Sequence, residues 1–205
     1  METFINNSYY IFAKDIITFL FTGTGLVIAG MGLATWKKQI KGVKEFETAH
    51  DLRYSILKLR NAIRNVRNPV IWPSESYQAM QDYKIKYPNK LETDAEKDSH
   101  AYVYEIRWKA ILAATAEMES HLLAAEVLWG PEILSLIKPL NKEIGELNIS
   151  LRQYFQPELR TKDFMELHNV IYYKGDYNED GTDDFDNRVL QAIDGVTSYI
   201  KNKIS

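Results

Sequence analysis

The first pattern along the chain is an uninterrupted apolar stretch over residues 16–36, with no charged residue between Asp15 and Lys37. A helix needs about 20 predominantly apolar residues to cross the hydrocarbon core of a bilayer, where backbone amides find no partner outside their own helix. This stretch, the apolar segment, meets that length. It predicts a transmembrane helix over residues 16–36, preceded by a short external N-terminus, residues 1–15.

Basic residues gather after the apolar segment and not before it. Ahead of it, Lys14 and Asp15 cancel, whereas Trp36 at its end is of a type that favours membrane interfaces. Lysine is retained on the cytoplasmic side of a membrane, so we expect the N-terminus outside and residues 37–205 inside. The expected membrane-interface cluster is Trp36, Lys37, Lys38, Lys41 and Lys44.

Two other interpretations of the apolar segment are open at this point. It can be the buried core helix of a soluble protein, although such a helix does not need so long an uncharged run. It can also be a cleaved signal peptide, with Gly32-Leu33-Ala34 as the cleavage site, although a signal peptide carries its basic residues ahead of the apolar run. Length and the order of charges both favour the transmembrane helix.

Small residues within the apolar segment predict that it self-associates. Helices in lipid gain little from hiding apolar side chains, so they associate where small residues let two backbones approach. Four such residues recur at gaps of three, four and three, which places them on one helix face. The alternative is that glycine is simply common in membrane helices. The expected packing face comprises Thr22, Gly25, Ala29 and Gly32.

Beyond the apolar segment, apolar residues recur at gaps of three and four, the pattern of helices that bury one face. Residues 37–67 are expected to form a long helix that stops at Asn68, because Pro69 disfavours a helical conformation in the residue before it. Its expected buried stripe is Ile40, Val43, Phe46, Leu52, Ile56, Leu59, Ile63 and Val66.

The same pattern predicts two more long helices in the middle of the chain. One covers residues 92–129 and the next residues 131–155, separated by Gly130 and Pro131. Pro139 lies inside the latter and should kink or split it. The expected buried stripe of residues 92–129 is Val103, Ile106, Ala110, Ala114, Met118, Leu122, Ala125 and Trp129.

The connecting parts carry weaker patterns. Residues 69–91 hold three prolines and few periodic apolar residues, which predicts a long loop with Val70, Ile71 and Trp72 as its anchor in the core. Residues 158–171 are expected to form a short helix, and a brief extended piece is expected at Val170–Tyr173.

A last helix is expected from Phe185 to Ile204, capped by Asp183 or Asp184. The predicted fold class is therefore all-α, an N-terminal single transmembrane helix followed by a cytoplasmic bundle of long helices, residues 37–205.

Part of this chain resembles a known group of proteins. The likeness rests on Thr35-Trp36-Lys37-Lys38-Gln39, Lys41-Gly42 and the stretch from Leu59 to Pro69. These residues look like those of uncharacterised bacterial proteins with one N-terminal membrane helix and a helical cytoplasmic part. The resemblance covers about residues 15–70 and implies the same topology, at the inner membrane. That group carries no activity that could be transferred.

Charge is unevenly spread over the chain, whose net charge is −3. Residues 37–67 are basic and the part beyond them is acidic. Four arginines of the basic part share one helix face, Arg53, Arg60, Arg64 and Arg67. They can pair with the acidic part, contact anionic lipid, or bind an anionic ligand or a partner. Internal pairing is favoured, since Arg67 would lie about 45 Å along a helix from Lys37, at about 1.5 Å per residue, whereas a membrane surface potential fades within about 8 Å.

One stretch resembles the start of a calcium-binding loop. Asp176, Asn178 and Asp180 occupy the first three ligand positions, and Gly181 follows them. Asn187 stands where the pattern needs a bidentate Glu, so a turn that leads into the last helix is favoured over a calcium site.

No other motif predicts catalysis or a cofactor. Cysteine is absent, which excludes thiol chemistry. Glu47 and His50 form a Glu-x-x-His pair, but a di-iron bundle needs a second copy and two further glutamates. Phosphate-binding loops and nucleophile elbows are missing. We expect no enzyme activity, no cofactor and no metal site. Nucleic acid is not expected as a partner, because the chain is acidic and has no stacking motif.

The sequence therefore predicts a single-pass membrane protein whose helical bundle binds an unknown protein partner, or has a scaffolding or regulatory role, at the inner membrane. The lipid bilayer and further copies of the chain are its other expected partners. The alternative is a membrane effector, in which the bundle senses a signal and the oligomerised spans perturb the bilayer.

Overall fold

The computed structural model describes residues 2–89, 92–174 and 182–204, and within these ranges the fold is all-helical, with no strand. This confirms the all-α part of the predicted fold class. The chain divides into two units, residues 1–46 and residues 47–205. The helices in chain order are α1 (Glu2–Val66), α2 (Pro73–Lys86), α3 (Glu92–Trp129), α4 (Glu132–Phe155), the 3-10 turn η1 (Pro157–Leu159), α5 (Phe164–Ile171) and α6 (Asp184–Ile204).

The first unit consists of the N-terminal part of α1, which contains the whole apolar segment. Its large apolar side chains are exposed, Phe19 to 79% and Phe21 to 76%. By length and composition this helix is able to cross a membrane. Because none of its apolar window is buried within the chain, the interpretation as a buried core helix is wrong.

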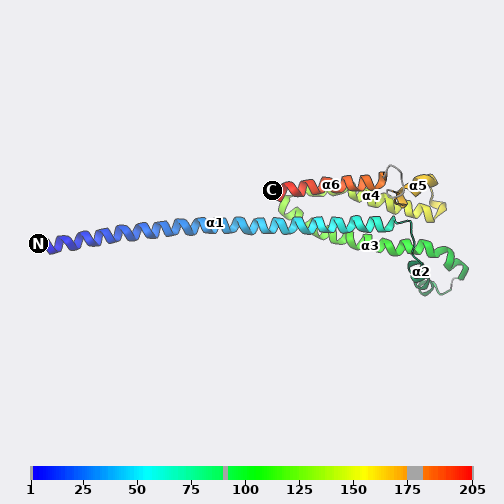
Figure 1. The fold of residues 1–205 in the computed structure, drawn as a ribbon, viewed down its shortest axis with the longest axis horizontal. Coiled ribbons are helices and arrows are strands. Elements are labelled where there is room, and N and C mark those ends of the chain that lie inside the picture. Colours follow the sequence, from blue (N-terminus) through cyan, green and yellow to red (C-terminus); the bar gives the residue numbers. More distant parts are fainter. Residues whose placement is uncertain (1, 90–91, 175–181, 205) are drawn as a thin grey trace. The chain divides into compact units, whose positions relative to one another are not determined.

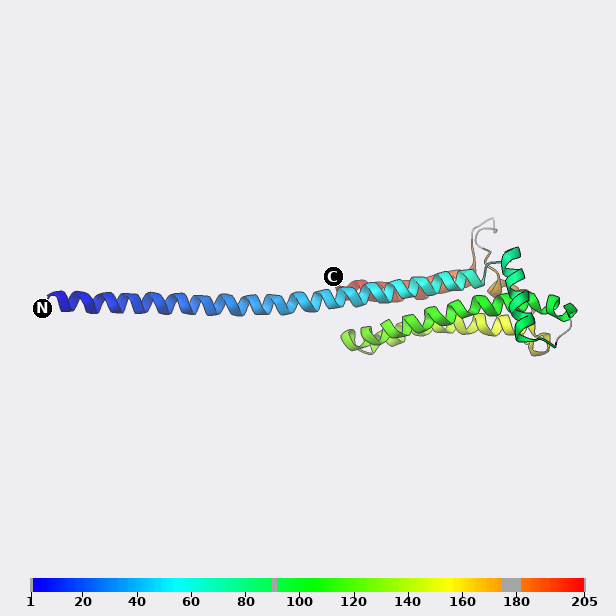
Figure 2. The same cartoon turned by 90° about the horizontal axis from the view of Figure 1, so that it is seen from below.

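The second unit is a helical bundle, in which the C-terminal part of α1 lies beside α3 and α6, and α4 packs against α3 and α6 (Figures 1 and 2). The stripe predicted for α1 is buried from Leu52 to Val66, each member at most 1% exposed. Ile40, Val43 and Phe46 are instead at least half exposed, so the prediction is wrong for these three. They belong to the first unit, which explains why the core of the bundle does not cover them.

Helices α3 and α4 follow the sequence pattern closely. Six members of the α3 stripe are buried, whereas Ile106 is only partly covered and Ala110 is exposed; Ile111 takes the core position next to it. Helix α4 runs through Pro139 without a break, so the predicted split does not occur. Pro139 lies on the exposed side, while Ile137 and Leu140 beside it are buried and hold the helix to the core.

The predicted loop over residues 69–91 is wrong, because it contains α2. Pro73 opens this helix, and the Glu75 carboxylate accepts a hydrogen bond from the Trp72 amide at 3.0 Å, which satisfies one free donor of the first turn. Only Ala79 and Tyr83 are buried, too few for a periodic signal. Of the expected anchor, Ile71 packs against the core, whereas Val70 and Trp72 are 41% and 60% exposed, so the prediction is wrong for these two.

The predicted short helix and last helix are present as α5 and α6. Asp163 caps α5 through the Met165 amide at 2.9 Å. Val170 and Ile171 are its last residues, so the extended piece expected at 170–173 is wrong for these two, whereas Tyr172 has an extended backbone. Asp183 caps α6, because its Oδ1 accepts from the Asp186 amide at 2.8 Å.

Candidate functional site

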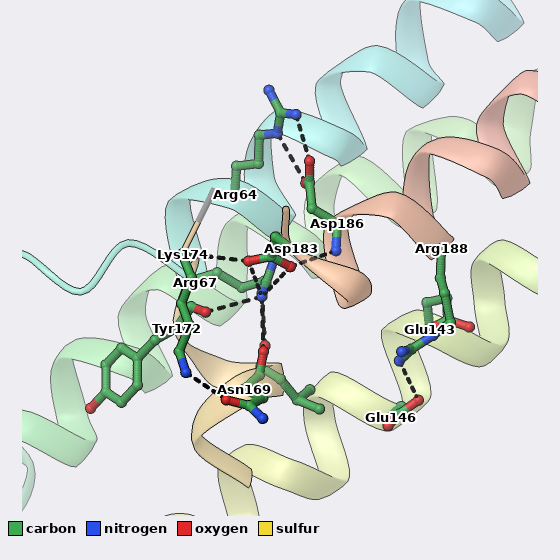
Figure 3. Close-up of polar contacts among 11 residues, drawn as sticks. Arg64, Arg67, Glu143, Glu146, Asn169, Tyr172, Lys174, Asp183, Asp186 and Arg188 are labelled. Atoms are coloured by element: carbon green, nitrogen blue, oxygen red, sulfur yellow. Dashed lines mark hydrogen bonds and ion pairs between the residues drawn. The ribbon is translucent and has the colours of Figure 1, made fainter. Parts of the chain in front are cut away.

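The most buried charge in the bundle is Arg67, one residue beyond α1. Its side chain is 0% exposed, and its Nη2 lies 3.0 Å from both carboxylate oxygens of Asp183 (Figure 3). Its Nε donates to the carbonyl of Val170 at 2.7 Å, and Nη2 also donates to those of Asn169 and Tyr172, both at 3.1 Å. Arg67 thus binds carbonyls that the end of α5 leaves without helical partners.

Both members of this ion pair also form hydrogen bonds that hold helix ends in place. Asp183 caps α6 and also accepts from the Lys174 amide at 2.8 Å. Burial lowers the pKa of Arg67 from its ordinary value, and the nearby carboxylate of Asp183 opposes that shift. The pair therefore fixes the ends of three helices, α1, α5 and α6, although the buried Nη1 of Arg67 has no hydrogen-bond partner among the residues that the structure describes.

The predicted arginine face is thus divided between two roles. Arg64 binds the Asp186 carboxylate through two hydrogen bonds, of 3.1 and 2.7 Å (Figure 3). The internal pairing favoured from the sequence is confirmed for Arg64 and Arg67. Arg53 is exposed, and Arg60 contacts Asn61 on the same helix.

A second buried arginine, Arg107 on α3, was not singled out from the sequence. It is 4% exposed and donates to the carbonyls of Asn68 and Val70, each at 2.7 Å, and to both oxygens of Glu75. It therefore holds the segment between α1 and α2. Its burial could have been predicted, because it lies four residues after Val103 and four before Ile111, which are both core residues.

A polar cavity of about 490 Å³ lies beside Asp183 of this pair, and ion pairs join three of its charged lining residues, Glu146, Lys162 and Arg188. Arg188 binds Glu143 at 2.9 Å and Glu146 at 3.0 Å (Figure 3), and Lys162 also binds Glu146, at 3.2 Å. These pairs indicate a structural role for this cavity.

The metal motifs gain no support from the part of the chain that the structure describes, where no group of three His, Cys, Asp or Glu side chains is placed to hold an ion. Residues 176–181 of the calcium-like stretch lie outside that part. His50 lies exposed beside Asp51, 3.1 Å away.

The residues predicted for membrane contact and span packing are all exposed. This holds for the interface cluster of Trp36 and the four lysines that follow it, and for the packing face that begins at Thr22. A Cβ placed on Gly25 or Gly32 meets no other atom within 4 Å. The backbone there is open to a neighbouring helix.

Aromatic side chains gather between α4 and α5 around His168. The Tyr154 hydroxyl lies 3.3 Å from that of Tyr172, and burial together with this neighbour raises the pKa of Tyr154 to about 12. The His168 and Tyr172 ring centroids are 4.4 Å apart. Burial, and secondarily the charge of Lys174, lowers the pKa of His168. These tyrosines stay neutral near pH 7 and act as packing residues.

A second aromatic group forms an open groove between α2, α3 and α4, with a volume of about 580 Å³. The sequence pattern did not predict this groove, because Tyr83 and Tyr87 come from α2 and its C-terminal end, a stretch predicted to be a loop. We call it the aromatic groove. Its lining is Tyr83, Tyr87, Ala101, Tyr102, Tyr104, Glu105, Trp108, Asn148, Leu151, Arg152, Phe155 and Gln156.

No protein-family model, no curated protein and no solved structure matches this chain. What the protein does is therefore inferred from its own residues and their geometry.

Proposed function

We propose that this chain is a single-pass inner-membrane protein, anchored by residues 16–36, whose cytoplasmic helical bundle binds a protein partner. The anchor is supported by the exposure of the apolar segment, since large apolar side chains without a cover in the chain need lipid or protein around them. Trp36 and the lysines after it support a cytoplasmic C-terminus.

The outer face of α3 is the observation that carries the partner-binding role. Core residues occupy one side of this helix, as in any bundle, but the opposite side is also uncharged over four turns. Leu112, Leu123 and Val127 are 58%, 63% and 85% exposed there. A helix that is apolar on both sides is ordinarily buried on both. The face comprises Leu112, Ala113, Ala116, Ser120, Leu123, Ala124 and Val127, all exposed.

The negative charge along one edge of this face indicates which kind of partner would bind it. Glu119 and Glu126 follow one of its edges at a spacing of seven residues, so two copies packed antiparallel and face to face would bring like charges together. An amphipathic helix with Lys or Arg beside its apolar stripe meets the same edge with opposite charge. We therefore assign the face to a basic amphipathic helix of a partner protein.

Photo-crosslinking in membranes tests this assignment on the full-length protein. A crosslinking residue at Val127 should yield a product whose sequenced peptide is a basic amphipathic helix, and Glu119→Lys with Glu126→Lys should abolish it. A crosslinking residue at Ile149, exposed on α4, is the control. Capture of a second copy of this chain, or no product, would contradict the assignment.

Reporter fusions test the anchor separately. A C-terminal reporter that is active only in the cytosol should work, and one that is active only outside should be silent. The opposite pattern would overturn the orientation inferred from the lysines.

The effector role remains the alternative, because the same exposed segment could assemble within the bilayer. Expression would then depolarise cells, and replacement of residues 16–36 by a polyleucine span would abolish the effect. Harmless expression of the full chain favours the partner-binding role instead.

A further inference from the structure

The aromatic groove combines two kinds of wall that suit one class of ligand. On one side are rings from α2 and α3. Tyr83 and Tyr102 pack edge to face, with centroids 5.8 Å apart, and Trp108 lies further along α3, partly buried. Such rings present flat apolar faces and edges that favour stacking with another planar ring. A volume of about 580 Å³ lies within the range of small-molecule sites.

The other side of the groove is a set of hydrogen-bond donors at the C-terminal end of α4. Asn148 and Arg152 are four residues apart on one edge of the helix, Gln156 is the residue that follows its last turn, and all three line the groove. An arginine offers a planar set of N–H donors that matches a carboxylate, sulfonate or phosphate, and the two amides add further donors. Phe155 continues the apolar wall between them.

The net charge along the groove favours an anion. Its one carboxylate, Glu105, is already bound by Lys86, whose Nζ lies 2.7 Å away. The same Nζ lies 5.4 Å from the Tyr87 ring centroid and 5.3 Å from that of Tyr102. Lys86 therefore offsets Glu105 at the aromatic wall, and Arg152 leaves the groove with a positive balance.

We propose that the aromatic groove is a binding site for a small planar aromatic anion, whose ring lies against Trp108 and the tyrosines and whose anionic group binds Arg152. This site goes beyond the proposed function and does not rest on it, since the groove lies wholly within the bundle. Its occupant touches residues of α2, α3 and α4 together, so ligand binding would stabilise the packing of these helices.

Calorimetry on the full-length protein in detergent micelles tests the proposal with two matched probes. Naphthalene-2-sulfonate carries the ring and the anion, and naphthalene-2-sulfonamide is a neutral molecule of nearly the same shape. Titration of empty micelles with each probe measures partition into detergent. We expect saturable binding of the sulfonate at one site, at least tenfold tighter than binding of the sulfonamide.

Two substitutions locate the site. Arg152→Gln should weaken sulfonate binding about tenfold, the loss expected for one charged hydrogen-bonding partner, and leave the weaker sulfonamide binding unchanged. Arg53→Gln, at an exposed arginine outside the groove, should change neither. Trp108→Leu should weaken both probes, with circular dichroism to verify the fold. Absence of saturable sulfonate binding, or equal effects of Arg152→Gln and Arg53→Gln, would overturn the proposal.

Discussion

Arg67 Nη2 lies 3.0 Å from both carboxylate oxygens of Asp183, and neither side chain is more than 5% exposed. This contact joins the end of α1 to the start of α6, two helices far apart in the chain (Figure 3). A buried pair of this kind is costly to break, because removal of one partner leaves the other charge buried and uncompensated. The Arg67–Asp183 ion pair therefore stabilises the packing of α1 and α6 in the bundle.

Breaking the Arg67–Asp183 ion pair should destabilise the bundle strongly. We expect Asp183→Asn, which keeps a good helix cap but removes the charge, to lower the free energy of unfolding by about 3–5 kcal/mol. Arg53→Ala, at an exposed arginine of α1, should change it by less than about 0.5 kcal/mol. Urea unfolding followed by circular dichroism measures both. A loss below about 1 kcal/mol for Asp183→Asn would show that Arg67 finds another partner.

The two ends of the stripe predicted on α1 should respond differently to truncation. Ile56 is 1% exposed and Ile40 is 50% exposed. Ile56→Ala leaves a cavity in the core and should cost about 2–5 kcal/mol of unfolding free energy, whereas Ile40→Ala should cost less than about 0.5 kcal/mol. The same unfolding assay compares them. Equal losses would place Ile40 in the core of the bundle.

The long helices could be predicted from the sequence because their pattern and their packing agree. Leu52 to Val66 on α1 and Met118 to Trp129 on α3 repeat at gaps of three and four and are buried together. Periodicity reports that a face is apolar, however, and not what covers it. For that reason it assigned Val43 to the same stripe as Val66, although Val43 is 58% exposed.

The aromatic groove and α2 were missed for a physical reason as well. Helix α2 is held by the start supplied by Pro73 and by the contact of Glu75 with Arg107, not by a long apolar stripe. Arg107 interacts with carbonyls, which every residue carries, so its partners leave no trace in the sequence pattern. Without α2, Tyr83 and Tyr87 could not be assigned to the same groove as Trp108.

The pairing of Glu75 with Arg107 should make stability depend on pH in the acid range. Its hydrogen bonds with Arg107 lower the pKa of Glu75 below its ordinary value, and its partial burial opposes this. The ionised form is therefore favoured in the folded state. Its contribution is complete above the unfolded pKa of about 4.3 and is lost as the pH falls through the folded pKa.

Glu75→Gln should accordingly lower the unfolding free energy at pH 7 by about 1–3 kcal/mol and flatten the decline of stability below about pH 5. Glu105→Gln is the control, because its pair with Lys86 is half exposed and such pairs contribute less than about 1 kcal/mol. An unchanged pH profile in Glu75→Gln would show that Arg107 is held by the carbonyls alone.

His168 should titrate below its ordinary pKa of about 6.5. Burial is the main cause and the charge of Lys174 the second. Because the neutral form is favoured in the folded state, protonation opposes folding and stability falls as the pH drops below about 6.5. Proton NMR of the ring, assigned with His168→Gln, gives the midpoint. Lys174→Gln should raise that midpoint but keep it below 6.5, and a midpoint that does not move would exclude the contribution of Lys174.

The packing face of the apolar segment provides the last prediction, that the span self-associates in membranes. Thr22, Gly25, Ala29 and Gly32 share one face, and in lipid the close approach of backbones at small residues supplies much of the association energy. Apart from the local backbone of the helix itself, no atom of the described residues lies within 4 Å of a Cβ built at Gly25, Gly30 or Gly32, so a larger side chain starts in open space in the monomer. Any loss of association therefore reports a contact between copies.

Crosslinking of the full-length protein in native membranes measures this association. Gly25→Leu and Gly32→Leu should each reduce the dimer yield several-fold, because the bulky side chain separates the backbones. Gly30→Leu is the matched control, since the same change falls about 140° around the helix from Gly25, at about 100° per residue. If the unaltered protein stays monomeric, or if all three variants behave alike, the face is not an interface. In that case the effector role, which needs assembled spans, loses its support, whereas the partner-binding role of α3 is unaffected.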